Sequence, residues 1–339
     1  MTAARATTAR EYAWKPEDLL FAIEERRAQG WIETVPLWEQ ARGMKDWLAV
    51  LVALVACPAF AGEKPAPPSA LLAAAEKLRP LMQKKTPPKP GDWLAEHRED
   101  GQTFDQYVAS NPNRPTAERT TLYILPIGDF TKAQDALVKD TAEAMAAFFG
   151  LKVKTLEPLP DAAIPARARR THPSWGVKQF HTAYILDELL LKLRPRDAVA
   201  LLGLTATDLF PEPSWNFVFG QASLQNRVGV WSLARYGDAE KDHLAVLRRT
   251  LKVALHETGH MFGIAHCTLH ECGMNGANNL PETDRGPMPF CAECDLKLWW
   301  ACNLDPVTRY GALADFAKKR GLTSEEAEWR KRAEALVKK

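Results

Sequence analysis

One stretch restricts the fold of this chain more than any other: the pattern H-E-x-x-H-x-x-G-x-x-H, which runs from His256 to His266. The apolar spacing of the preceding residues predicts a helix over 243–262, and a helix places His256 and His260 one turn apart on one face. Gly263 permits the helix to end and the chain to turn, which returns His266 toward the same point. The pattern therefore predicts a helix and a tight turn that bring three imidazoles together.

The same residues suit zinc chemistry. Three imidazole ligands leave the fourth position of a tetrahedral zinc open to water, which is typical of a catalytic rather than a structural site. Glu257 adjoins the first histidine, where its carboxylate can take a proton from zinc-bound water. The alternative is a helix with ordinary histidines, but the added Gly263 and His266 make the pattern specific. We therefore predict a catalytic zinc on the three histidines, with Glu257 as its general base.

Four cysteines in two close pairs follow the histidines: Cys267, Cys272, Cys291 and Cys294. This spacing is typical of a closed tetrahedral site of four thiolates, in which no position remains for water and the zinc is structural. Cys302 lies outside this set, and we expect it to be a small buried residue. The sequence therefore predicts two zinc ions per chain.

The combined motif resembles that of the archaemetzincins, which reads H-E-x-x-H-x-x-G-x-x-H-C-x4-C-x-M, about seventeen residues, then C-x2-C. This chain has sixteen residues between Met274 and Cys291, a difference that a loop rich in Gly and Pro can absorb. The resemblance implies the two zinc sites above and Met274 as the methionine beneath the catalytic metal, with Met288 as a weaker candidate. It extends from near Gly91 to near Asn303. The upstream segments that carry it are Asp92 to Leu94, Glu99, Gly101 to Phe104, Tyr123 to Gly128, Gln179 with Phe180, Thr205, Asp208 with Leu209, Asn216 to Gly220, and Arg235.

The resemblance implies a zinc metallopeptidase, with a peptide or protein as substrate and with Glu257 activating zinc-bound water. The first alternative is a zinc-binding protein that keeps the fold without useful cleavage, although an intact Glu257 argues against it. The second is a four-cysteine module for nucleic-acid or protein docking. A net charge of +2, from 44 basic and 42 acidic residues, and the lack of a basic stripe argue against a nucleic-acid partner. We expect a monomer.

The apolar patterns predict a mixed α/β (α+β) fold. The expected strands and helices are strands at 122–127, 151–156 and 198–204, helices at 133–149 and 180–193, and a hairpin of 216–223 with 227–233. In metzincins an antiparallel edge strand above the zinc binds an extended substrate through its backbone, and chain order makes 216–223 its counterpart here. The candidate substrate-binding residues are Asn216, Phe217, Val218, Phe219 and Gly220. Core packing is the competing role for Phe217 and Phe219.

We expect four parts along the chain. They are an N-terminal extension at 1–61 with a signal segment at 44–61, a Pro-rich linker and arm at 62–115, a catalytic domain at 116–322 with its second zinc site at 267–294, and a charged C-terminal helix at 323–339.

The segment that begins at Met44 resembles a bacterial export signal. Trp47 to Ala61 carries no charge, and the residues before Gly62 have the small-x-small form that signal peptidase cleaves. About fifteen apolar residues are too few to span a bilayer permanently. We therefore expect a periplasmic, secreted or lipid-anchored protein, whose one membrane attachment would be a lipid on Cys57. The alternative is a longer cytoplasmic protein in which residues 1–43 are real.

Overall fold

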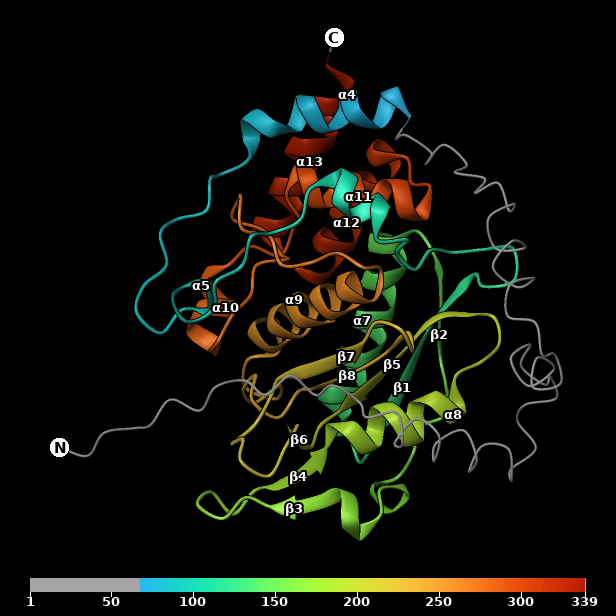
Figure 1. The fold of residues 1–339 in the computed structure, drawn as a ribbon, viewed down its shortest axis with the longest axis vertical. Helices are drawn as coiled ribbons and strands as arrows, with labels where there is room; N and C mark the ends of the chain where they lie inside the picture. Colours follow the sequence, from blue (N-terminus) through green and yellow to red (C-terminus); the bar gives the residue numbers. More distant parts are fainter. Residues whose placement is uncertain (1–67, 339) are drawn as a thin grey trace, which may run out of the picture. The chain divides into compact units, whose positions relative to one another are not determined.

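The computed structural model describes residues 68–338, so the predicted signal segment at 44–61 and Cys57 lie outside the described residues. Within the described part of the chain, no helix is both long enough and apolar enough to cross a bilayer. These residues form a mixed α/β fold, as predicted, in which helices cover both faces of a five-stranded sheet (Figure 1).

The main sheet has the strand order β2-β1-β5-β8-β7. Its strands are β1 (Thr121–Ile127), β2 (Lys152–Thr155), β5 (Ala198–Thr205), β7 (Gly220–Ser223) and β8 (Val228–Ser232). The first four strands in this order run parallel, and β7 pairs antiparallel with β8 at the edge. Every residue of β1, β5 and β8 is buried, as expected for parallel strands covered on both faces. The strands predicted at 122–127, 151–156 and 198–204 are confirmed, and an antiparallel edge strand is present at Gly220–Ser223, within the range predicted for it.

Alternate side chains of the central strands enter two separate cores, because successive residues of a strand point to opposite faces. Ile124 and Leu202 pack in the core that contains α7 (Lys132–Phe149) and α9 (His243–Met261). Neighbouring strand residues pack in a second core with the helical segment that follows β4. Both α7 and α9 match predicted helices. Each begins at a side-chain cap, since the side chain of Thr131 accepts from Gln134 N and that of Asp242 accepts from Ala245 N.

A three-stranded sheet lies beside the second core, in the order β3-β4-β6 (Figure 1). Its strands are β3 (Arg169–Thr171), β4 (Lys178–His181) and β6 (Asp208–Phe210). The prediction of a helix over 180–193 is wrong at its start, because Phe180 and His181 pair with β6 in β4. The helical part is a π-helix at Tyr184–Leu190 followed by α8 at Leu191–Leu193.

Helices from the two ends of the described chain pack together around the cysteine-rich region. They are α4 (Ser69–Leu78), α11 (Ala292–Cys302), α12 (Pro306–Arg320) and α13 (Thr323–Val337). The charged helix α13 is not simply solvated, because Trp329 is buried and Glu325 accepts two hydrogen bonds from Arg248 of α9. The remaining short elements are α5 (Trp93–Glu96), α6 (Phe104–Ala109), α10 (Leu280–Arg285), and 3-10 turns at Arg79–Leu81, Asp161–Ala163 and Ala166–Ala168.

Residues 82–113, here called the arm, connect α4 to β1 and include α5 and α6. Figure 1 shows the arm passing along the C-terminal helices and the loops around α10 before it reaches the sheet. Its first part pairs with the cysteine-rich segment, since Lys85 N donates to Leu269 O and Glu271 N donates to Gln83 O. The arm therefore places residues from early in the sequence beside the end of α9.

Candidate active site

The turn at the end of α9 brings the third histidine back toward the first two. Gly263 has a φ of +82°, a left-handed conformation that favours glycine. Gly263 N donates to His260 O at 2.7 Å, and Ile264 N donates to Gly259 O at 3.1 Å. These two bonds form a Schellman motif, which ends the helix and reverses the chain. The sequence pattern predicted this role for Gly263.

The three histidines form one cluster in which their ligand atoms lie within 4.8 Å of one another. In each ring Nδ1 faces an oxygen: His256 faces Gly273 O at 2.9 Å, His260 faces Ile264 O at 2.8 Å, and His266 faces the Glu99 carboxylate at 2.9 Å. A carbonyl or an ionised carboxylate can only accept, so each Nδ1 must carry the proton. In the neutral form of each ring, Nε2 then offers a lone pair.

This cluster fits a bound cation. Nε2 of His256 and Nε2 of His260 are 2.9 Å apart, and two unprotonated nitrogens cannot bond to each other. A shared metal ion satisfies both lone pairs. Burial, and then the neighbouring histidines, hold the pKa of His256 well below its usual value and lower the pKa of His260 to about 4. The rings of His256 and His260 are thus neutral at pH 7, the form that zinc binds.

Glu257 follows His256 directly on α9 and lies at a cleft. Glu257, His256 and Phe219 line this cleft, which has a volume of about 560 Å³. Burial raises the pKa of Glu257 to about 7. A cation on the histidines would lower this pKa, because it favours the charged carboxylate. The group therefore lies where it can exchange protons with a molecule in the cleft.

The five candidate substrate-binding residues lie in different surroundings. Phe219 lines the cleft, and Gly220 begins the edge strand β7. Two of the others contact the small sheet, since Asn216 O accepts from Gln179 and Val218 bridges to Leu209. The centroid of the Phe217 ring lies 3.5 Å from Cζ of Arg235. The edge strand thus begins at Gly220 rather than at Asn216 as predicted, and of the five residues Phe219 alone lines the cleft.

The four paired cysteines form a second cluster, in which all four sulfur atoms lie within 4.8 Å of one another and every residue is buried. None of the four forms a disulfide, and Sγ of Cys267 lies 3.7 Å from Sγ of Cys291. Sγ of Cys272 accepts hydrogen bonds from Met274 N at 3.4 Å and Cys291 N at 3.1 Å. Such bonds stabilise a thiolate, so the donor set fits a closed zinc site. Cys302 lies outside the cluster.

Met274 is fully buried and packs against α9 at Gly259. A Cβ atom on Gly259 would lie only 2.5 Å from Sδ of Met274, so only glycine fits there without displacement. Sequence reasoning did not single out Gly259, although a glycine inside a helix costs about 1 kcal/mol relative to alanine and so points to a packing role. It treated Glu99 only as part of the resemblance.

Three clustered histidines that suit zinc, with a carboxyl group next to the first of them at a cleft, are the donor set of a zinc metallopeptidase. Comparison with known proteins gives the same class, since residues 181–299 match the model of peptidase family M54. Archaemetzincin-2 of Macaca fascicularis is 36% identical over 259 residues, which cover 66% of this chain and 71% of that relative. Archaemetzincin-1 of Homo sapiens is 30% identical over 257 residues, which cover 66% and 51%.

The chain belongs to the archaemetzincin family, as the motif predicted. It is accordingly a hydrolase that acts on peptides or proteins. A crystal structure of an archaemetzincin from Methanopyrus kandleri shares 29% sequence identity and covers 56% of this chain and 99% of its own, with a TM-score of 0.44.

Proposed function

We propose that the histidine cluster holds a catalytic zinc ion and that Glu257 is the general base and acid of peptide-bond hydrolysis. The observation that carries this proposal is the convergence of the ligand atoms of three histidines, of which His256 lines a cleft together with the neighbouring Glu257. Three protein ligands suit a site that keeps one position for water or substrate.

The bound zinc would supply two effects, a lower pKa for water and polarisation of the peptide carbonyl. Glu257 accepts a proton from the attacking water at its carboxylate and then donates that proton to the leaving amine. The Nδ1–H bonds of the histidines hold the three rings so that their Nε2 atoms would face the proposed zinc ion. The outer edge of β7 has free backbone groups that can pair with an extended peptide.

For the cysteine cluster we propose a second, structural zinc on Cys267, Cys272, Cys291 and Cys294. Support comes from four buried sulfur atoms near one another and from the backbone donors to Cys272. A closed thiolate set leaves no position for water, so this ion would take no part in hydrolysis. His266 and Cys267 are consecutive, and the thiolate cluster would thereby help to fix the position of the third histidine.

The test is a peptide-library digest by the parent and by Glu257→Gln, with zinc content measured on the same samples. Glu257→Gln should keep its zinc and its fold but lose at least about a hundredfold in cleavage rate, the lower end of what a positioned general base contributes. Glu240→Gln, which removes an exposed carboxylate just before α9, is the matched control and should cleave like the parent.

Two outcomes would count against the proposal. Full activity in Glu257→Gln would mean that another group activates the water. A parent protein that holds zinc but cleaves nothing in the library would favour the alternative of a zinc-binding protein that has lost catalysis.

A further inference from the structure

We propose that Glu99 is a positioning residue for the metal site: its carboxylate orients His266, and the arm thereby completes the histidine cluster. This inference rests on the proposed zinc site. Both carboxylate oxygens lie within hydrogen-bonding distance of His266 Nδ1, at 2.9 and 3.0 Å. The partners are 167 positions apart in the sequence, so only the folded arm brings them together.

The third histidine differs from the other two in its partner. His256 and His260 donate to main-chain carbonyls, whereas His266 donates to a side chain. A carboxylate partner selects the tautomer with a proton on Nδ1 and makes Nε2 a stronger donor to a metal. The pair is largely shielded, with 18% of the His266 side chain and 27% of the Glu99 side chain exposed, so water competes with the contact only in part.

A second residue of the arm fixes the turn that carries His266. Gln102 Nε2 donates to Gly263 O at 3.1 Å, and Ala265 N donates to Gln102 Oε1 at 3.2 Å. The ring of Trp93 lies edge-on to His266, with 5.1 Å between the ring centroids. The arm therefore contacts both the backbone before this histidine and the ring itself.

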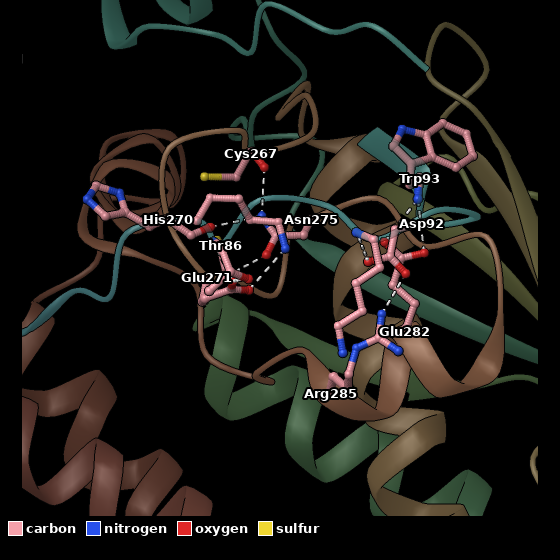
Figure 2. Close-up of polar contacts among 12 residues, drawn as sticks. Thr86, Asp92, Trp93, Cys267, His270, Glu271, Asn275, Glu282 and Arg285 are labelled. Carbon is pink, nitrogen blue, oxygen red and sulfur yellow. Dashed lines mark hydrogen bonds and ion pairs between the residues drawn. The ribbon is translucent and has the colours of Figure 1, made fainter. Parts of the chain in front are cut away.

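The arm is held in place by other contacts as well. Figure 2 shows Thr86 bonded to Glu271, Arg285 bonded to Asp92, and the backbone of Trp93 bonded to Glu282. Tyr107 OH also donates to Phe262 O at 2.9 Å. Loss of the Glu99 carboxylate should thus leave the arm docked and change only the support of His266.

The experiment measures zinc affinity of the full chain by competition with a chromophoric chelator, for the parent, Glu99→Ala and Glu99→Gln. Loss of a carboxylate that supports a metal-bound histidine weakens metal binding by about 10-fold to 100-fold, so we expect this loss at the histidine site in Glu99→Ala. Glu99→Gln keeps an acceptor oxygen but loses the charge, and should fall between the parent and Glu99→Ala.

Asp100→Asn is the matched control, because it removes the same charge from the neighbouring, exposed residue. It should bind zinc like the parent. Thermal stability in excess zinc should be equal in all four proteins, and the thiolate site should keep its ion. These readouts separate support of His266 from general damage to the fold and from long-range charge effects.

Parent-like affinity in Glu99→Ala would overturn the proposal, as would equal weakening in Asp100→Asn and Glu99→Gln. His266→Ala tests the underlying site separately. If that variant also binds zinc like the parent, the proposed histidine site itself fails. If it loses zinc while Glu99→Ala does not, only the positioning role of Glu99 fails.

Discussion

Substitution of Gly263 by alanine should lower the stability of the fold or the zinc affinity of the histidine site. Gly321→Ala is the matched control for this change. Gly263 and Gly321 both end a helix with the same two backbone bonds and with positive φ, +82° and +70°. A Cβ at Gly321 meets nothing within 4 Å, whereas a Cβ at Gly263 would lie 2.8 Å from Cβ of Pro112. The two variants therefore share the backbone strain and differ in the clash.

The magnitudes follow from this difference. A left-handed residue other than glycine costs about 1–2 kcal/mol, offset by about 0.4–1 kcal/mol from the stiffer unfolded chain, and both variants carry these terms. Overpacking adds about 1–3 kcal/mol in Gly263→Ala alone. Pro112 cannot withdraw freely, because the next residue, Asn113, donates to the carbonyls of Val199 and Met261.

Urea unfolding in excess zinc should therefore show Gly263→Ala less stable than Gly321→Ala by about 1–3 kcal/mol, with similar m values. If the turn yields instead of Pro112, His266 moves and zinc affinity at the histidine site falls, while Gly321→Ala keeps its affinity. Equal stability and equal zinc affinity in the two variants would refute the reasoning.

Three further predictions concern the metals and the C-terminal helix. Metal analysis should find two zinc ions per chain, and a chelator should remove the open histidine site before the closed thiolate site; a single, tightly held zinc would contradict this. Cys294→Ser should fold poorly and lose the histidine zinc as well, because a structural zinc contributes on the order of 10 kcal/mol; a soluble, fully active variant would contradict it. Against the opposing effect of burial, the Arg248 hydrogen bonds hold the pKa of Glu325 below its usual value. The parent should thus be more stable than Glu325→Gln at pH 7, and this advantage should shrink as the pH falls through the lowered pKa of Glu325. An advantage that grows in acid would contradict a stabilising ion pair between Glu325 and Arg248.

The part of the fold that the sequence predicted is specified locally. The helix expected at 243–262 is observed at His243–Met261, because its apolar spacing and its terminal glycine act within a few residues. The buried strands β1 and β5 follow from continuous apolar runs for the same reason. The histidine and cysteine clusters could also be predicted, since the members of each lie close together in the sequence at spacings typical of zinc ligands.

The parts that were missed depend on partners far away in the sequence. Strands β3 and β6 have three residues each, too few for a periodic pattern, and they exist because each pairs with β4. The end of β4, at Phe180 and His181, is predicted as helix because an apolar run at 184–190 follows it closely. The contact between Glu99 and His266 could not be predicted, because no sequence pattern around either residue indicates that the two lie together in the fold.

The hydrogen bonds that the three histidines donate from Nδ1 differ in how readily a point mutation can remove them. Main-chain acceptors are present whatever side chain occupies Gly273 or Ile264, so point mutations at these positions leave the acceptor atom itself in place. Glu99 instead contributes its acceptor through its side chain. If Glu99 acts as proposed, natural selection or an engineer could adjust the hold on zinc by substitution at position 99, without exchanging any of the three ligands.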